Sequence, residues 1–304
     1  MISDEFNSKI WIYFETNLKP RTRKEYFKII NDFNKEIGHD PLTLTSKEAK
    51  QYYNYLLNKM EHNLISYSTG VMRLSVIRSI CNFIEYYNIN HGNKYINYFK
   101  EYSLPEPDRL IDEKGIPNSL EINNILEAIK ERDDKKAFLI FSLAVKCALT
   151  NSEICKLNME YIVLDKTSNS ICINYPANSR NNIARTIKIP EDVAKLLDEY
   201  IYENNIKEGP VFINKRKNRM QLRDSERLIE KYCKICLDNN KIRNKYTLQA
   251  LRHAGLSYML AGGAPKDAVA NYAGITGRWM TRYDRIITSK TYNQAVNYSI
   301  ITIQ

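Results

Sequence analysis

The sequence predicts a mainly helical protein of two domains, with a small antiparallel β-sheet in the second domain. Three observations lead to this prediction: helical spacing of apolar residues through positions 4–88, a proline-rich stretch at 102–117, and two alternating β-branched runs at 170–175 and 185–190. The chain has 304 residues, and single hydrophobic cores usually stop growing near ~250–300 residues. Two domains with separate cores are therefore the expected arrangement.

The first domain, residues 1–101, is predicted to be a bundle of about four helices, because apolar residues return every three or four positions along it. The predicted breaks fall at 19–22, 38–41 and 66–69, where proline, glycine or hydroxyl residues interrupt the pattern. Two of the helix starts carry basic or hydroxyl side chains, which together with N-terminal amides suit phosphate groups. The candidate phosphate ligands are Arg21, Arg23, Lys24, Tyr67, Ser68, Thr69, Arg73 and Arg78.

Residues 102–117 are predicted to be a linker, because they include three prolines and one glycine without a sustained period. The second domain then runs from 118 to 304. Its alternating runs predict a β-hairpin, with the polar residues 177–184 between the two strands. Helices are predicted around the hairpin at 120–132, 135–149, 192–204, 224–239, 247–260 and 266–273.

The charge of the chain favours a polyanionic partner. Lysine and arginine outnumber acidic residues by 45 to 35, and the formal net charge of +10 suits nucleic acid or an anionic membrane surface. No stretch approaches the ~20 apolar residues of a membrane span and the first residues lack a secretory pattern, so a cytoplasmic protein is expected.

Only Cys233 and Cys236 have metal-ligand spacing. Without a second pair nearby they are interpreted as one helix face, and no metal site is predicted.

Two segments near the C-terminal end identify a family. Residues 246–260, YTLQALRHAGLSYML, resemble the His-x-x-Arg-His box of tyrosine recombinases, with Arg252 and His253 matching and Gln249 in place of the first histidine. Residues 271–283, NYAGITGRWMTRY, resemble the Leu-Gly-His motif that precedes the nucleophilic tyrosine of that family by nine residues. Gly274 then stands at the histidine or tryptophan position, and Tyr283 falls in register as the nucleophile.

Two further segments agree with this register. Residues 148–157, ALTNSEICKL, resemble the Thr-Gly-Leu-Arg-x-Ser-Glu-Leu motif, with Glu153 kept and Thr150 in place of the first catalytic arginine. The predicted hairpin resembles the one that carries the catalytic lysine of the family, and, counted back from Arg185, the position of that lysine falls to Arg180. Since the likeness covers nearly the whole chain, it implies a helical SAM-like core-binding domain followed by a tyrosine-recombinase catalytic domain, the two closing around duplex DNA.

The resemblance also implies a reaction. A tyrosine hydroxyl, here that of Tyr283, attacks a DNA phosphodiester and forms a 3′-phosphotyrosyl link, with no metal or cofactor. Arg252 would supply one half of the arginine clamp on the phosphate, whereas a hydroxyl at position 150 brings no charge. Lys146, four residues before Thr150, would lie on the same helix face and replace part of the missing charge.

The remaining candidates for catalysis have limited chemistry. Gln249 donates a hydrogen bond but cannot titrate, and Arg180 carries charge but is a poor general acid. His253 is expected to support the site, with direct proton transfer as the alternative.

Other basic residues are candidates for contact with the DNA backbone. Arg216 and Arg219 lie in a basic stretch, and Arg278 and Arg282 flank the candidate nucleophile. The alternatives are a polar loop for the first pair and a solvated helix face for the second. The tail at 291–304 is expected either to dock on a neighbouring copy on DNA or to fold back on its own domain. Accessory DNA-binding proteins stay open as further partners.

Three functions compete at this point. The first is site-specific strand cleavage and rejoining, as in an integrase of a mobile element. The second is relaxase-like nicking at a plasmid transfer origin in conjugation. The third is a DNA-binding protein without catalytic activity, which the residues at positions 150, 249 and 274 favour. Retention of Arg252 and Tyr283 favours cleavage over simple decay of the site.

Overall fold

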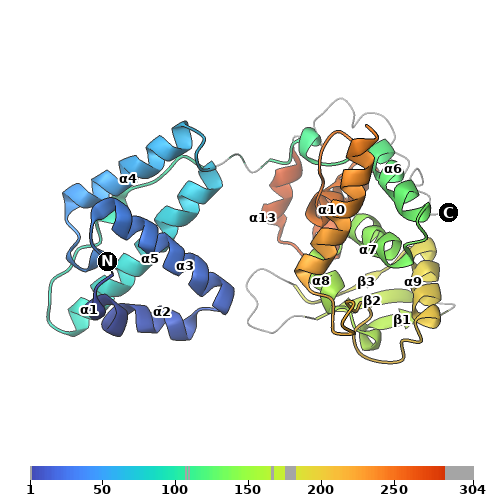
Figure 1. Ribbon diagram of the computed structural model, residues 1–304, viewed down its shortest axis with the longest axis horizontal. Helices are drawn as coiled ribbons and strands as arrows, with labels where there is room; N and C mark the ends of the chain where they lie inside the picture. Colours follow the sequence, from blue (N-terminus) through green and yellow to red (C-terminus); the bar gives the residue numbers. More distant parts are fainter. Residues whose placement is uncertain (1, 107, 109, 166–167, 175–182, 285–304) are drawn as a thin grey trace. The chain divides into compact units, whose positions relative to one another are not determined.

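The computed structural model describes residues 2–106, 108, 110–165, 168–174 and 183–284. The predicted fold class is confirmed, because helices dominate and the described residues include a small antiparallel sheet (Figure 1). The chain divides into two compact units, Met1–Asp108 and Arg109–Gln304, and each unit has a hydrophobic core of its own.

The first unit is a helical bundle around a core rich in aromatic side chains. Phe33 and Tyr52 are fully buried there and meet edge to face, with ring centroids 4.8 Å apart. A capping box of Thr45 and Glu48 begins one helix, and Ser66 caps the next by accepting a hydrogen bond from a backbone N–H. The helical segments are α1 (Asp4–Phe6), the π-helical turn η1 (Asn7–Trp11), α2 (Ile12–Asn17), α3 (Pro20–Ile37), η2 (Pro41–Thr43), α4 (Ser46–Glu61), α5 (Tyr67–Asn90) and η3 (Tyr98–Glu101).

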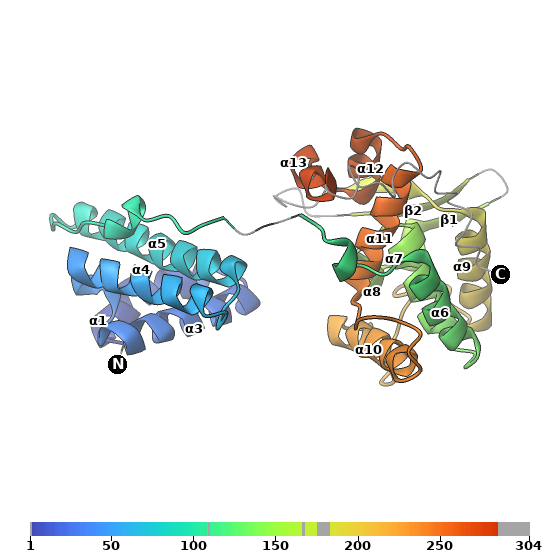
Figure 2. The same cartoon turned by 90° about the horizontal axis from the view of Figure 1, so that it is seen from above.

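In the second unit, two helices, α7 (Lys135–Lys146) and α11 (Leu248–Ala261), lie at the centre, and three others surround them (Figure 2). The surrounding helices are α6 (Ser119–Lys130), α9 (Glu191–Glu203) and α10 (Leu222–Asp238). The shorter segments are η4 (Glu113–Gly115), α8 (Asn151–Lys156), η5 (Met159–Tyr161), α12 (Lys266–Ala273), α13 (Gly277–Met280) and η6 (Thr281–Tyr283).

The sheet consists of β1 (Ile162–Leu164), β2 (Asn169–Ile173) and β3 (Arg185–Lys188), antiparallel in that order. Ile171 of β2 lies opposite Ile162 on one side and Ile187 on the other. All three isoleucines are buried, so one face of the sheet packs on the core of the unit. The pair β2–β3 is the predicted hairpin, whereas β1 is too short to show an alternating pattern in the sequence.

One predicted helix ends earlier than expected. The spacing predicts a helix over 135–149, but α7 ends at Lys146, and Ala148 adopts a φ of +50°. A positive φ cannot continue a right-handed helix, so the chain turns and Thr150 begins α8 as its N-cap. Lys146 and Thr150 therefore share no helix face, and the prediction that they do is wrong.

Candidate active site

Helix α11 places three of the candidate side chains, and its close packing on α7 holds it in position. Thr247 caps the helix by accepting a hydrogen bond from Ala250 N–H. Gly255 permits the close approach, because a Cβ built at this position would lie 1.9 Å from the carbonyl oxygen of Val145 in α7. Gln249, Arg252 and His253 lie on α11 within two turns of this contact.

The guanidinium of Arg252 is buried, with 3% of the residue exposed, and is held by groups from two neighbouring segments. It donates to the carbonyl oxygen of Ala148 and, at 2.8 Å, to that of Ala273. Its Nη1 also lies 3.5 Å from Oε2 of Glu153. These partners determine the direction of the guanidinium, because its donors form a rigid planar fork.

Glu153 connects Arg252 to a second arginine. It belongs to the capping box at the start of α8, where Thr150 N–H donates to its Oε2 at 2.7 Å. Its other oxygen accepts a 2.7 Å hydrogen bond from Nη1 of Arg185 at the start of β3. Burial raises the pKa of Glu153, but the hydrogen bond and charge of Arg185, the Thr150 N–H and the charge of Arg252 together outweigh that effect, so the pKa lies below its ordinary value and the side chain is a carboxylate.

Tyr283 is buried in η6, with 1% of the residue exposed, and its hydroxyl meets the ring of His253. Oη of Tyr283 lies 2.6 Å from Nδ1 of His253. Burial raises the pKa of Tyr283 above its ordinary value, although nearby Arg252 and Arg282 oppose that shift. Burial also lowers the pKa of His253 to about 4, and the charges of the two arginines lower it further. Both side chains of the pair are therefore neutral near neutral pH.

Gln249 contacts the other nitrogen of the same imidazole. Its Nε2 lies 3.1 Å from Nε2 of His253, one helical turn away on α11. The two positions of an amide group are related by a simple flip, so the side chain can also present its oxygen to this nitrogen. A chain of three polar groups thus runs from Gln249 through His253 to Tyr283.

A cavity of about 200 Å³ gathers the residues that the sequence motifs identify. Seven of these line it: Thr150, Glu153, Gln249, Arg252, His253, Gly274 and Tyr283. The rest of the lining is formed by Leu256, Ala273, Ile275, Trp279 and Arg282. The cavity combines a tyrosine hydroxyl, a neutral imidazole, the buried guanidinium of Arg252 and the half-buried side chain of Arg282, groups that attack on a phosphodiester can use.

Two features favour glycine at position 274: its backbone conformation and a neighbouring side chain. Gly274 ends α12 with a φ of +65°, a conformation that residues with a Cβ rarely adopt. A Cβ there would lie 2.4 Å from Nη1 of Arg185. The guanidinium of Arg185 therefore lies close to the backbone at this position.

The two basic residues near Tyr283 differ in their surroundings. Arg282 lines the cavity, and its guanidinium carbon lies 3.9 Å from the centroid of the Trp279 ring, a cation–π contact. Arg278 is exposed in α13. Of the two, Arg282 is the one placed beside the candidate nucleophile.

In the first unit, the candidate phosphate ligands divide into exposed and internally bonded groups. Arg21 and Lys24 are exposed near the start of α3, and Tyr67 and Ser68 are exposed in the first turn of α5. Thr69, also in the first turn of α5, is only partly exposed, and its hydroxyl lies 2.9 Å from that of Ser66. Three arginines already have protein partners in this unit: Arg23 with the carbonyl oxygen of Glu15, Arg73 with Asp32, and Arg78 with the carbonyl oxygens of Phe99 and Tyr102.

The other candidates of the second unit are placed as follows. Lys146 is buried and forms an ion pair with Asp192 of α9. Arg219 donates to the side chain of Asn158, whereas Arg216 is exposed. Arg180 and the tail at 291–304 lie outside the described residues.

Arg185, the residue from which position 180 of the hairpin is counted, contacts a residue of the site, and the sequence did not predict that contact. The sequence did indicate that Arg185 faces the core, because it shares one face of a β-branched run with Ile187 and Ile189, and both isoleucines are buried. A charged residue on the buried face of a strand requires a partner of opposite charge, and the sequence could not identify which one.

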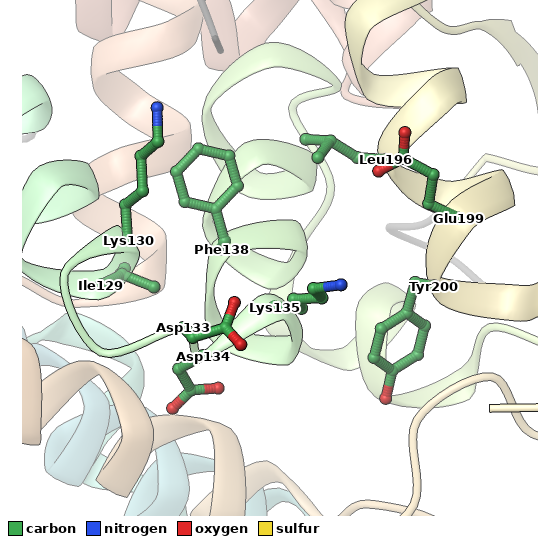
Figure 3. Close-up of a pocket in the computed structure, with 9 residues that line it drawn as sticks. All are labelled: Ile129, Lys130, Asp133, Asp134, Lys135, Phe138, Leu196, Glu199 and Tyr200. Atoms are coloured by element: carbon green, nitrogen blue, oxygen red, sulfur yellow. The ribbon is translucent and has the colours of Figure 1, made fainter. Parts of the chain in front are cut away.

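A second cavity, of about 160 Å³, lies between α6, α7 and α9. Figure 3 shows Phe138 of α7 between Lys130 of α6 and Leu196 of α9. Two of the charged groups that line it have structural partners: Lys135 pairs with Glu203, and Asp134 caps α7 and accepts a hydrogen bond from Tyr232. This cavity shares no residue with the one around Tyr283.

The described residues contain neither a metal-binding cluster nor a membrane-spanning helix. No group of three or more His, Cys, Asp and Glu residues could hold a metal ion in this part of the chain. Within the same residues, every helix is too short or too polar to cross a membrane.

Comparison with known proteins gives matches over both units. Residues 118–283 match the model described as the phage integrase family. The tyrosine recombinase XerC of Syntrophus aciditrophicus (strain SB) is 21% identical over 279 residues, covering 86% of this chain and 85% of that protein.

Solved structures show the same fold at low sequence identity. The Tn1549 transposon integrase in complex with circular intermediate DNA has a TM-score of 0.70 at 14% identity, covering 90% of this chain and 91% of that one. A lambda integrase dimer bound to a COC′ core site has a TM-score of 0.66 at 14% identity, covering 91% and 93%.

Proposed function

This chain belongs to the phage integrase family, and from that premise we propose that it binds duplex DNA and breaks one strand through Tyr283. The observation that carries the proposal is the cavity in which the hydroxyl of Tyr283, the imidazole of His253 and the guanidinium of Arg252 lie together. The relatives that share the fold are named as recombinases and integrases, two of them in complexes with DNA, which supports DNA as the substrate.

In the proposed step, Oη of Tyr283 attacks the phosphorus of a phosphodiester. A P–O bond to the tyrosine forms while the bond to the 5′-oxygen breaks, and the phenol proton passes to Nδ1 of His253, 2.6 Å away. Since both partners are neutral near neutral pH, the proton moves as the oxygen attacks. The departing 5′-oxygen takes a proton from solvent, because a guanidinium at position 180 is a poor acid.

The base role of His253 requires a specific tautomer. Nδ1 accepts the phenol proton only when the ring hydrogen is on Nε2, and that hydrogen can then be donated to the side-chain oxygen of Gln249 after a flip of the amide. Gln249 would thus orient the base, in place of the histidine that the family pattern has at this position. Arg252 would stabilise the charge that builds on the non-bridging oxygens.

Binding of the DNA backbone is assigned in this proposal to the exposed candidates. Arg21, Lys24, Tyr67 and Ser68 are exposed at two helix starts of the first unit, and Arg216 and Arg278 are exposed in the second. Contacts of this kind position the protein without reading sequence. Arg23, Arg73, Arg78 and Arg219 have protein partners, and we expect their removal to affect folding before DNA affinity.

The proposal is tested with supercoiled DNA from the replicon of the protein. Wild-type protein should yield DNA with a covalent protein link at a 3′ end, and Tyr283→Phe should yield none, because the substitution removes only the attacking oxygen. Tyr202→Phe is the matched control, since Tyr202 is 86% exposed on α9 and lines neither cavity, and it should match wild type.

The products separate three functions. Covalent nicks together with joined strands indicate recombination or integration, and covalent nicks alone indicate relaxase-like action. DNA binding without any covalent product contradicts the proposal and leaves a binding protein. That second candidate is favoured by one observation, the uncharged residues Thr150, Gln249 and Gly274 in the cavity.

A further inference from the structure

The cavity around Tyr283 contains a second guanidinium that the proposed step does not use. Arg282 lines the cavity together with Arg252, and its side chain is half-buried. Thr150 brings no charge to this cavity, and its hydroxyl accepts a hydrogen bond from the backbone N–H of Glu153. Attack on a phosphodiester builds negative charge on two non-bridging oxygens, and each positive group beside them stabilises the transition state.

The described charged side chains at the site have a positive sum. Glu153, Arg252 and Arg282 line the cavity, and Arg185 pairs with Glu153 at 2.7 Å. Three guanidinium groups and one carboxylate leave two positive units. The carboxylate balances one of the three positive charges, and Arg282 provides one of the two that remain for the scissile phosphate.

Arg282 directly precedes Tyr283 in η6, and its backbone is held in place. Its carbonyl oxygen accepts a 2.8 Å hydrogen bond from the N–H of Ile111. Burial and the charge of Arg252 lower the pKa of His253, and the charge of Arg282 adds to this effect. The same charge opposes the rise in the pKa of Tyr283 that burial causes. The guanidinium therefore lies within electrostatic reach of both groups that exchange the proton in the proposed step.

Trp279 holds the side chain of Arg282 at the cavity. The guanidinium carbon lies 3.9 Å from the centroid of the indole ring. Trp279 lines the cavity as well and is 40% exposed, so the stacked pair is accessible to a substrate. Stacking uses the face of the guanidinium, whereas its N–H donors lie in its plane, so the ring orients these donors without bonding to them.

We propose that Arg282, oriented by Trp279, is a catalytic residue whose guanidinium binds a non-bridging oxygen of the scissile phosphate beside Arg252. It supplies a charge that Thr150 does not. This inference rests on the proposed strand cleavage. Arg278 has no such role, because it is exposed and does not line the cavity.

The first test replaces Arg282 and measures covalent adduct formation in a single turnover at saturating DNA. Arg282→Gln should slow this step by about 10²-fold to 10³-fold, the usual effect of losing one preorganised donor. Arg282→Lys should keep more of the rate, because the charge remains. Lys231→Gln is the matched control, since Lys231 also lies over an aromatic ring, that of Tyr232 at 4.6 Å, but outside the cavity. It should cleave at the rate of the wild type.

A second substrate separates contact with the phosphate from folding. A methylphosphonate at the scissile position has a methyl group in place of one non-bridging oxygen and is neutral, so its transition state builds less negative charge. The ratio of the wild-type rate to the Arg282→Gln rate should therefore fall towards one on this DNA. A variant impaired only by misfolding would keep the same ratio on both substrates.

The role of Trp279 is tested by a double-mutant cycle. Trp279→Leu removes the ring and should slow adduct formation, and Trp279→Phe, which retains an aromatic face, should be slowed less. Because the ring acts through Arg282, Trp279→Leu should add little to the loss that Arg282→Gln already causes. Additive losses would show that Trp279 does not orient Arg282 and would overturn this part of the inference.

The outcomes distinguish this inference from the proposed function. If wild-type protein forms no covalent adduct, strand cleavage itself is wrong. If wild type forms the adduct and Arg282→Gln forms it at the same rate, or is slowed by the same factor on the neutral substrate, the inference about Arg282 is wrong and cleavage by Tyr283 stands.

Discussion

The hydrogen bond between Tyr283 and His253 joins two residues that burial keeps neutral. A phenol buried beside an imidazole does not ionise before it reacts, because burial raises its pKa. The same burial lowers the pKa of His253 to about 4, with the charges of Arg252 and Arg282 acting in the same direction. The imidazole is therefore available as a proton acceptor at neutral pH instead of being occupied by a proton.

A consequence for stability can be measured at this residue. The pKa of His253 is about 4 in the folded protein, against an ordinary value of 6.5 for the unfolded chain. The unfolded chain binds more protons between these values, so this contribution to stability is complete above pH 6.5 and is lost as the pH falls towards 4, by up to about 1.4 kcal/mol per pH unit. Urea unfolding at several pH values should show a shallower loss for His253→Gln than for wild type. Equal losses in the two proteins would contradict the assigned pKa.

Among the elements, the contact between α7 and α11 decides whether the site can form. Helix α11 carries Arg252 and His253, and the residues after α7 provide the carbonyl of Ala148 that holds Arg252. The two helices approach closely because Gly255 has no Cβ to meet Val145. Backbone packed against backbone cannot yield by a change of rotamer, so this position tolerates little enlargement.

We therefore expect Gly255→Ala to lower the free energy of unfolding by about 1–3 kcal/mol, the usual range for overpacking, or more if α11 is displaced. The midpoint of denaturant unfolding measures this change. Gly115→Ala is the control, because a Cβ at Gly115 meets nothing within 4 Å, and its midpoint should stay near that of the wild type. A Gly255→Ala midpoint equal to that of the control would show that α7 and α11 can separate without cost.

Over the whole molecule, only some of the positively charged side chains are available to bind DNA. The net charge of +10 comes from 45 basic residues, but several arginines are bonded to carboxylates or carbonyls inside the protein. Affinity for DNA depends on the cations that can reach phosphates, and each such contact releases counterions from the DNA. Net charge alone therefore overstates the number of contacts.

Salt dependence of DNA binding tests this difference between arginines. Arg21 is exposed at the start of α3, and Arg21→Gln should reduce the slope of log affinity against log salt by about 1. Arg78 donates to Phe99 and Tyr102 carbonyl oxygens, so Arg78→Gln should lower the unfolding midpoint and leave the slope of the folded protein unchanged. The opposite pattern would show that Arg78 leaves its carbonyl partners to bind DNA.

The amino-acid sequence by itself determined the fold class, the predicted hairpin and the set of residues around Tyr283. Periodicity is a local property, so the helices and the β2–β3 pair could be predicted from spacing. The motif positions 150, 153, 249, 252, 253, 274 and 283 could be assigned by register, and all seven line one cavity.

Only the tertiary structure decided which buried charges meet. Spacing placed Lys146 beside Thr150, but a positive φ at Ala148 ends the helix and Lys146 pairs with Asp192 instead. The partners of Arg185, Glu153 and the carbonyl oxygen of Tyr272, come from remote segments, so the sequence did not predict them. A buried charge is stable only beside a group of opposite charge or a hydrogen-bond partner. Which partner lies beside it depends on contacts between elements that are distant in the sequence, and no local pattern contains those contacts.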